Sequence, residues 1–434
     1  MSGYKKVFKN ISWILCCRIV QSAIALIINL ISARYLGPSN FGLLSYASSV
    51  VAFVVPLAKL GLRHVLVAEF VAQPEREGQI LGTSLLMCVM SSFLCILGCA
   101  AFVLVANAGE VDTLIVCLLY SISLIFESLE MTQYWFQAKL LSKYMAVTSL
   151  VAYLITALYK VFLLATGKSI YWFALSNALD YLIITIVLLI IYGRLEGQKL
   201  SFSFSLGKQL FRRCKYYIVS SMMVTIFAQT DKIMIKMMIG NAANGFYSTA
   251  VSCASMTAFV FLALIDSFGP VIYESRKKSH SLFEKNVSIL YSIIIYTALI
   301  QSTVLTIFAK PIVGILYGAD YMPAASLLQI VTWYTTFSYL GSARGIWVLA
   351  ENKQKYLWCI NLAGAFLNVV GNYFLIPILG TSGAAIASVV TQFFANVGMC
   401  ILLKPMRPTA KLMLRAINPM LLVSLWEERE DPDE

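Results

Sequence analysis

Long apolar runs, rather than alternating apolar and polar positions, dominate the hydrophobic pattern of this chain, and the run at 183–191 is typical of them. A helix that crosses a bilayer needs about 20 mostly apolar residues. Twelve stretches meet this requirement and predict twelve spans. They are 11–34, 41–62, 80–106, 113–137, 145–166, 171–192, 216–238, 246–272, 287–308, 324–349, 357–376 and 382–403.

The same pattern decides between the two architectures that a bilayer allows. Inside a membrane every backbone polar group needs an internal partner, so a spanning protein is a helix bundle or a closed barrel. Barrel strands would show alternation over roughly ten residues, which the continuous runs do not. Composition agrees, because 59% of the 434 residues are hydrophobic and only 12% are charged. We therefore predict an all-α polytopic membrane protein.

The basic residues predict the orientation of the spans. If the N-terminus is cytoplasmic, the segments on that side hold 25 of the 33 Lys and Arg residues. The opposite side holds only Arg34, Lys168 and Lys310. Cytoplasmic loops of membrane proteins are enriched in Lys and Arg, so both termini are predicted to be cytoplasmic. This bias also accounts for most of the net charge of +12, and nucleic-acid binding need not be invoked.

The segments between the spans are short, and the N-terminal segment lacks a small-residue cleavage site, so we expect the first span to be retained. A sizeable soluble catalytic domain does not fit between the spans. The stretch 408–426 is expected to be an interfacial helix, and 427–434 is an acidic tail. The ten cysteines and two histidines lack metal-site spacing, so the cysteines are expected to be reduced apolar residues.

An internal repeat divides the chain. The segment 35–47, YLGPSNFGLLSYA, ends the first span, and 238–250, MIGNAANGFYSTA, ends the seventh. Each turns on a glycine and reopens as a helix, although glycine turns also recur in unrelated helical membrane proteins. The repeat predicts two six-helix bundles around a central cavity, at 1–193 and 216–403. A basic linker at 194–215 joins them, and a tail at 404–434 follows. Facing bundles are a common transporter design.

Three motifs carry a resemblance to a known family. They are ARYLGPSNFG at 33–42, QTDKIMI at 229–235 followed by Gly240 and by GFYS at 245–248, and NVVGNYFLIP at 368–377 running into GTSGAA at 380–385. In order and spacing, the chain from about 5 to 405 resembles the polysaccharide-transport branch of the multidrug/oligosaccharidyl-lipid/polysaccharide exporter superfamily. The Wzx O-antigen flippases are the group it resembles most.

The resemblance implies a flippase without covalent chemistry. Its substrate would be undecaprenyl pyrophosphate carrying a short O-antigen oligosaccharide, moved from the cytoplasmic to the periplasmic leaflet of a bacterial inner membrane. Partners would include membrane lipid, an O-antigen polymerase and a chain-length regulator. No cofactor is implied, and a coupling proton or Na⁺ is left open.

Five cations lie within predicted spans and are candidates to bind a pyrophosphate. A charge at membrane depth is costly and usually faces a cavity or a partner. Lys and Arg supply the donors that phosphate oxygens accept, and Arg can do so bidentately. Alternatively, a long side chain near the end of a span snorkels to the surface. The candidates are Lys232 and Lys236, which share a helix face, with Lys160, Arg344 and Arg18.

Acidic and amide side chains within the spans offer further roles. Glu127 and Glu130 are three residues apart on one face, where they either bind a coupling ion or neutralise the cations. The other candidates for charge balance are Asp231, Asp180 and Asp266. Asn368 and Asn372 either contact sugar hydroxyls or join helices.

Two rival functions use other features. A drug or cation antiporter of the same superfamily would need an acid-rich cavity, and here five cations accompany the acids. A membrane-embedded O-antigen polymerase or glycosyltransferase would be expected to carry a large external loop, which the predicted topology lacks. A primary pump is disfavoured because the chain has no G-x-x-x-x-G-K-[ST] sequence.

Overall fold

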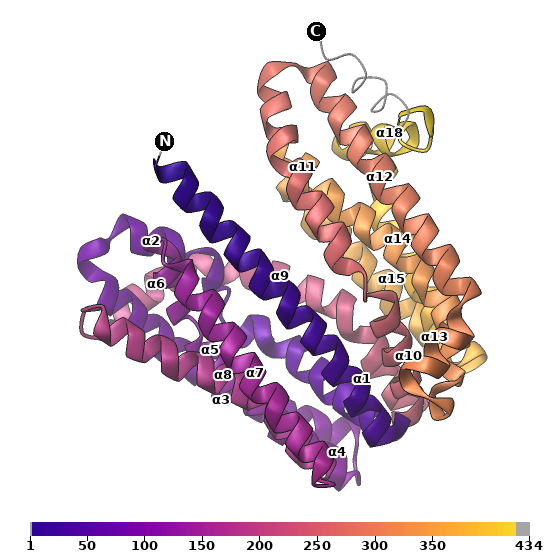
Figure 1. Ribbon diagram of the computed structural model, residues 1–434, viewed down its shortest axis with the longest axis horizontal. Helices are drawn as coiled ribbons and strands as arrows, with labels where there is room; N and C mark the ends of the chain where they lie inside the picture. Colours follow the sequence, from indigo (N-terminus) through magenta and orange to yellow (C-terminus); the bar gives the residue numbers. More distant parts are fainter. Residues whose placement is uncertain (1, 422–434) are drawn as a thin grey trace. The chain divides into compact units, whose positions relative to one another are not determined.

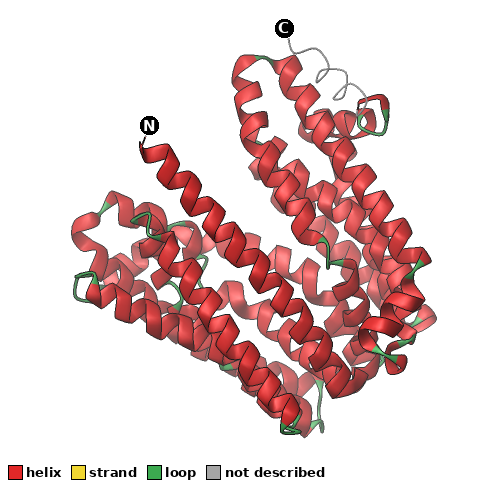
Figure 2. Cartoon of the chain, in the orientation of Figure 1, coloured by secondary structure: helices red, strands yellow, loops and turns green. Residues whose placement is uncertain are grey.

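The computed structural model describes the backbone of residues 2–421 and the side chains of residues 20–421. All regular structure in this part of the chain is helical, and Figure 2 shows the helices joined by short loops. The prediction of an all-α polytopic fold is therefore confirmed. The chain forms two compact units, Met1–Gly245 (unit 1) and Phe246–Glu434 (unit 2).

Unit 1 is built around one long, bent helix, α1 (Ser2–Ala58), which is broken at Gly37 and continues through Pro38 (Figure 1). Gly37 has a φ of 71°, a backbone conformation that favours glycine. This helix packs against several other helices of the unit. The helices after α1 are α2 (Leu66–Ala72), α3 (Glu77–Ala106), α4 (Val111–Ser121), α5 (Ser123–Leu129), α6 (Thr132–Ala138), α7 (Ser142–Ala165), α8 (Ile170–Arg194) and α9 (Phe204–Met238).

The division between the units falls inside α10 (Asn241–Ala254), so unit 2 begins with the part of α10 from Phe246 onward. Its most extensive helix pairs are α12 with α14 and α15 with α16. A π-helical turn, Phe394–Gly398, separates α16 from α17. The helices are α11 (Ala258–Lys278), α12 (His280–Ile307), α13 (Ala309–Tyr317), α14 (Pro323–Ala350), α15 (Leu357–Leu379), α16 (Thr381–Phe393), α17 (Met399–Leu402) and α18 (Arg407–Arg415).

The predicted spans correspond closely to these helices. Ten helices in the described part of the chain are long and apolar enough to cross a membrane. One of them, Val20–Ala58, covers most of the first two predicted spans, 11–34 and 41–62, on either side of Gly37. The predicted span 324–349 is the 28-residue helix α14, whose Thr332, Thr335 and Thr336 make it less apolar than the ten. The predicted span 246–272 is broken between α10 and α11.

The unit boundary differs from the predicted linker at 194–215. The part of α1 that follows Gly37 is called its second arm. The division falls after Gly245 because α9 packs along this second arm and against α3, so α9 belongs to unit 1. The predicted arrangement of two six-helix bundles facing a shared cavity stays a prediction. In the predicted tail, α18 packs against α12, where the hydroxyls of Tyr291 and Thr409 lie 2.7 Å apart. The acidic segment 427–434 lies outside the described residues.

The two copies of the repeat meet reciprocally within unit 1. A Cβ on Gly42 would overlap with the backbone carbonyl of Asn241, and one on Gly245 would overlap with that of Pro38. Gly42 corresponds to Gly245 in the repeat, and Pro38 corresponds to Asn241. Small residues let two helix starts approach closely in membrane proteins. The repeated glycines therefore form a quasi-symmetric crossing that only residues without a side chain allow.

The loops of unit 1 gather at two opposite ends, as alternating spans require. At one end, Gln198 donates to the backbone oxygen of Pro74, and Lys139 forms an ion pair with Glu77 at 2.5 Å. At the other end, the Tyr35 hydroxyl donates to the backbone oxygen of Lys168. The first end is the one that the Lys and Arg count assigns to the cytoplasm.

Candidate functional site

A polar cavity of about 780 Å³ lies inside unit 1. Four elements line it: the second arm of α1 with the turn that follows, the α4–α5 segment, α8 and α9. Its volume lies within the range of about 300–1,000 Å³ that is usual for ligand pockets. Most of the remaining buried interior of unit 1 is apolar, so this cavity is the natural candidate for a binding site.

An ion cluster lies at one end of the cavity. The Lys59 ammonium lies 2.8 Å from a carboxylate oxygen of Glu127 and 3.4 Å from one of Glu130. The three side chains are only 13–17% exposed. Lys59 and Glu127 line the cavity, whereas Glu130 is not part of its lining. A buried charge is tolerated when it is paired, and here one cation serves two anions.

Breaks in a predicted span place the two glutamates. The stretch predicted as one span, 113–137, is divided into α4, α5 and α6. Ser121, Ser123 and Thr132 turn their hydroxyls back onto carbonyls three or four residues earlier, a bond that competes with regular helix geometry. Glu127 and Glu130 lie on and just after the short helix α5, so both reach Lys59 from one side, as their spacing predicted.

The turn after α1 places Lys59. Leu60 and Gly61 both have positive φ, 50° and 63°, so the chain turns sharply directly after Lys59. A Cβ on Gly61 would lie 3.1 Å from the backbone of Cys214 and Ile218, so glycine allows this turn to pack closely on α9. The carbonyls at a helix C-terminus also favour a cation. Lys59 is thus held at the end of α1 and points inward instead of into water.

The cavity walls combine rings, amides and hydroxyls. The rings are those of Tyr120, Tyr181 and Tyr217, and the amides are those of Asn177 and Gln229. The Ser49 hydroxyl and the Gln229 side-chain oxygen lie 3.0 Å apart, which joins α1 to α9 beside the cavity. Such walls can bond to several hydroxyl groups and offer ring faces at the same time.

The cavity extends far along the spans. Its lining runs from Ser48 to Lys59 on α1 and from Tyr217 to Gln229 on α9. At 1.5 Å per residue, these stretches measure about 16–18 Å, roughly half of a bilayer core of about 30 Å. The cavity therefore reaches from the end of the spans that holds Lys59 to about the middle of the unit.

The lining at the Lys59 end includes a second cation and a stacked pair of rings. Arg63 lies there with His64, whose ring stacks on Tyr217 with centroids 4.8 Å apart. Burial, and then the neighbouring Arg63, lower the pKa of His64. Because its ordinary pKa is about 6.5, His64 is neutral at pH 7. The positive charge at this end therefore comes from Lys59 and Arg63.

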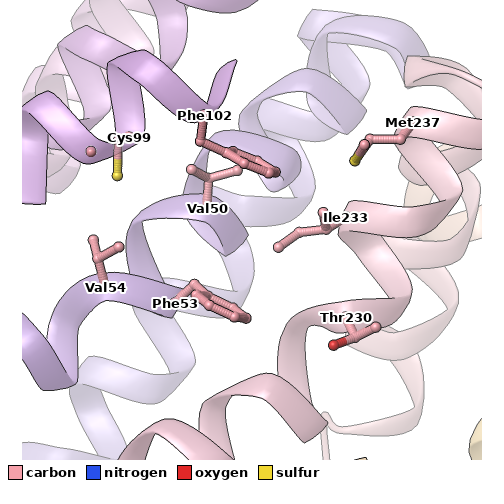
Figure 3. A pocket seen from close by; sticks show the side chains of 9 residues that line it. Val50, Phe53, Val54, Cys99, Phe102, Thr230, Ile233 and Met237 are labelled. Atoms are coloured by element: carbon pink, nitrogen blue, oxygen red, sulfur yellow. The ribbon is translucent and has the colours of Figure 1, made fainter. Parts of the chain in front are cut away.

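A second, apolar cavity of about 440 Å³ lies against another face of α9 (Figure 3). Figure 3 shows Val50 and Phe53 of α1 opposite Ile233 of α9, with Phe102 of α3 above them. Thr230 supplies the one hydroxyl among the lining side chains. This lining suits hydrocarbon, whereas the larger cavity suits a polar group.

The predicted pair of α9 lysines does not line the polar cavity. Lys236 is buried, forms an ion pair with Glu110 at 2.5 Å, and lies 5.1 Å above the ring of Tyr46. Lys232 is half-buried, next to Asp231. The ion pair holds Lys236 at the end of unit 1 away from Lys59. Lys236 is thus a local structural cation in this conformation, and its role with substrate stays a prediction.

The remaining predicted cations lie elsewhere. Lys160 on α7 is half-buried and lines neither cavity. Arg344 in unit 2 is 4% exposed and donates from Nη1 to the carbonyls of Ala395 and Asn396, both at 3.2 Å. These carbonyls belong to the π-helical turn, so Arg344 secures that turn. The side chain of Arg18 lies outside the described residues.

The predicted acidic residues also differ in their surroundings. Glu127 and Glu130 pair with Lys59 and not with one of the five candidate cations, and their role in binding a coupling ion stays a prediction. Asp231 is buried and Asp180 is half-buried, whereas Asp266 is exposed.

The two candidate asparagines are fully buried in unit 2. Asn372 donates to Asn368 at 3.3 Å. This hydrogen bond joins two residues of the same helix, α15, and sugar binding stays a prediction.

Lys59 is the functional candidate that the sequence reasoning missed. It lies one residue beyond the helical end of α1 and near the end of the predicted span 41–62, and the 25 Lys and Arg residues assigned to the cytoplasmic side include it. The available signal was the pairing of a lysine at a span end with two glutamates on another span, Glu127 and Glu130. Pattern alone does not show that they meet. The eight described cysteines are free, and no metal-binding cluster occurs among the described residues.

Comparison with solved structures defines the class of fold. The chain is similar to "Lipid II flippase MurJ, inward closed conformation", with a TM-score of 0.71 and 14% identity, covering 94% of this chain and 91% of that one. It is also similar to an inward-facing "multidrug resistance MATE family transporter of the MOP superfamily", with a TM-score of 0.66 and 12% identity, covering 90% and 95%. The fold is that of multi-pass membrane transporters.

Sequence comparison defines the family. The family described as "Polysaccharide biosynthesis protein" matches residues 7–275, so the chain belongs to that family. The predicted membership of a polysaccharide-transport family is confirmed. The chain is 22% identical to the "Capsular polysaccharide biosynthesis protein CapF" of Staphylococcus aureus over 89% of this chain and 96% of that protein.

An archaeal relative matches over a shorter part. The chain is 27% identical to the "Uncharacterized membrane protein MJ1068" of Methanocaldococcus jannaschii over 52% of this chain. The match spans about half, 47%, of that relative's length.

Proposed function

We propose that this protein is a flippase for a polyprenyl-diphosphate-linked oligosaccharide. The substrate would be an O-antigen unit on undecaprenyl diphosphate, moved from the cytoplasmic to the periplasmic leaflet of a bacterial inner membrane. Both chain termini would be cytoplasmic. The observation that carries the proposal is the polar cavity of unit 1, which has a paired cation at one end and rings, amides and hydroxyls along its walls.

The chemistry of the cavity matches the two polar parts of such a lipid. A diphosphate needs cationic donors, which Lys59 and Arg63 supply at one end. An oligosaccharide offers many hydroxyls and flat apolar faces, which amides, hydroxyls and tyrosine rings complement. The apolar cavity beside Ile233 suits hydrocarbon. Membership of the polysaccharide biosynthesis family and the transporter fold support the same substrate class.

The ion cluster disfavours the rival antiporter. A cation-attracting cavity needs free carboxylates, whereas Glu127 and Glu130 are both engaged by Lys59. The proposal includes no covalent step and no cofactor, and transport would proceed by alternating access. A coupling ion, H⁺ or Na⁺, would supply the driving force. An O-antigen polymerase and a chain-length regulator would act on the exported units.

The test combines a deletion strain with a substitution that fills the cavity with a large side chain. Ser220 on α9 lines the cavity, whereas its neighbour Val219 is 57% exposed and lines neither cavity. The deletion should accumulate lipid-linked units in the inner leaflet and lose surface polysaccharide. Wild type and Val219→Trp should restore the surface polysaccharide, and Ser220→Trp should not, at equal membrane levels. Single units exposed on the surface of the deletion strain would refute transport and indicate a polymerase.

A further inference from the structure

The ion cluster of the polar cavity carries more anions than cations. Lys59 bonds to Glu127 and Glu130, and their formal charges sum to one negative. A cavity that serves only to attract an anion would place the lysine there without acids. The two glutamates therefore need an explanation beyond simple attraction of a phosphate.

The ammonium of Lys59 is arranged to have two kinds of neighbour. It has three N–H donors, and the two carboxylates engage two of them. Lys59 and Glu127 both line the cavity, and Glu130 is not part of the lining. The ammonium is thus bound to carboxylates and also belongs to the cavity wall, where an anion that enters can reach it.

The anchoring of Lys59 permits it to change partners. It lies just after the last helical residue of α1, Ala58, and before a turn with positive φ at Leu60 and Gly61. Its four-carbon side chain is flexible and its ammonium is a point charge without a fixed fork geometry. Arg344, by comparison, is held by two backbone carbonyls of a helical turn.

We propose that Lys59 is a displaceable counter-ion. Glu127 and Glu130 hold it while the cavity is empty, and a phosphate group of the substrate takes it from them. This inference rests on the proposed function and deepens it, because it names the group that binds the diphosphate and the groups that limit its affinity. Glu127 and Glu130 act as competitors of the substrate and not as its ligands.

The competition has two consequences for transport. A neutral or cationic solute offers Lys59 no replacement for its carboxylates, so only an anion can open the cluster, which gives selectivity. The carboxylates also lower the affinity of the site for the phosphate, because they compete for Lys59 and repel the phosphate charge. A transport site must bind strongly enough to load and weakly enough to release. The cluster meets both requirements with three side chains.

Binding of a short polyprenyl diphosphate, farnesyl diphosphate, to purified protein in lipid nanodiscs tests the proposal. Glu127→Gln with Glu130→Gln removes the competitors and should tighten the Kd about tenfold, the value of one charge-assisted hydrogen bond. Adding Lys59→Gln to that double variant should abolish the gain and leave binding weaker than wild type. The triple variant keeps amide hydrogen bonds and no unpaired charge, so folding does not depend on the broken pair.

Controls separate this inference from the proposed function. Lys139→Gln breaks a comparable ion pair with Glu77 away from the cavity and should not change the Kd. Farnesol, which lacks the diphosphate, should bind all variants equally. A triple variant that binds farnesyl diphosphate as tightly as the double variant, or a double variant no tighter than wild type, would overturn the inference. Neither result would alter the accumulation of lipid-linked units in the deletion strain, which tests the function.

Discussion

Unit 1 and unit 2 each bury a cation near the end of a span and hold it in different ways. Lys59 in unit 1 is bound by two carboxylates at the edge of a cavity. Arg344 in unit 2 is bound by backbone carbonyls of a π-helical turn and lies 3.3 Å from the sulfur of Cys400. A side-chain anion can move and be replaced, whereas a backbone carbonyl is fixed. The comparison teaches that the partner, more than the buried charge, decides whether a cation is available to a ligand.

The local sequence explains why Arg344 is locked. A π-helical turn bonds residue i to residue i+5, so it departs from the regular hydrogen bonding of the helices beside it. Gly341, one turn before Arg344 on α14, makes room for the side chain of Asn396, because a Cβ there would overlap with it. Gly341 and Arg344 therefore lie on one face of α14 that packs on the turn, and Arg344 donates to two carbonyls of that turn.

The largest effect is expected when Lys59 alone is removed. Lys59→Met leaves two mostly buried carboxylates facing each other, so the free energy of unfolding should fall by about 3 kcal/mol. Denaturant titration in detergent, followed by circular dichroism, measures this. Lys278→Met, whose ion pair with Glu274 is 65% exposed on both sides, should lose less than about 1 kcal/mol. Equal losses in the two variants would contradict the burial of the Lys59 cluster.

A smaller loss is expected for the locked cation. Arg344→Met removes the donors to the carbonyls of Ala395 and Asn396 and should cost about 2 kcal/mol. The same titration measures it. Lys278→Met serves again as the control, because both side chains of its ion pair with Glu274 are 65% exposed, and it should cost less than about 1 kcal/mol. Unchanged stability of Arg344→Met would show that the π-helical turn does not depend on this side chain.

The displaceable cluster should tolerate complete neutralisation. Lys59→Gln, Glu127→Gln and Glu130→Gln together replace the ions with amides that can bond to each other. Stability should stay within about 1 kcal/mol of wild type, since replacing a whole buried ion cluster is often neutral. A loss as large as that of Lys59→Met would mean that the charges themselves hold α1 to α5, and the contrast with Arg344 would disappear.

The smallest effect concerns the ion pair at the opposite end of unit 1, and it depends on pH. Partial burial acts to raise the pKa of Glu110, but hydrogen bonds from Lys236 and Thr113 outweigh it and hold that pKa below its ordinary value. A depressed folded-state pKa contributes stability above the unfolded-state value, which is lost as pH falls through the folded-state pKa. Because Glu110 is 48% exposed, the contribution should be at most about 1 kcal/mol.

Melting temperatures of wild type and Glu110→Gln as a function of pH measure this contribution. Wild type should be the more stable at pH 7, and the two curves should converge as the solution is acidified below the pKa of Glu110. A difference that persists or grows in acid would mean that the amide perturbs packing around Lys236 and that the charge of Glu110 is not the cause.

Much of the fold could be predicted because it depends on local composition. The spans follow from apolar length, and the turn at Gly37 and the equivalence of Gly42 with Gly245 follow from the repeat. The shared face of Glu127 and Glu130 follows from helical periodicity. The partner of those glutamates could not be predicted, since Lys59 lies 68 or more positions away and at a span end. A lysine there has the same local pattern whether it points to water or inward.

The sequence by itself determined that this chain lies in a bilayer as helices, where its loops turn, and to which family it belongs. Apolar length, glycine and basic loops act locally, so they can be interpreted without coordinates. Only the tertiary structure decided which charges meet. In it Lys59 forms ion pairs with Glu127 and Glu130, and Lys236 forms one with Glu110. Arg344 donates to backbone carbonyls instead. The physical reason is that the energy of a buried charge depends on groups a few ångströms away, which the order of residues does not specify.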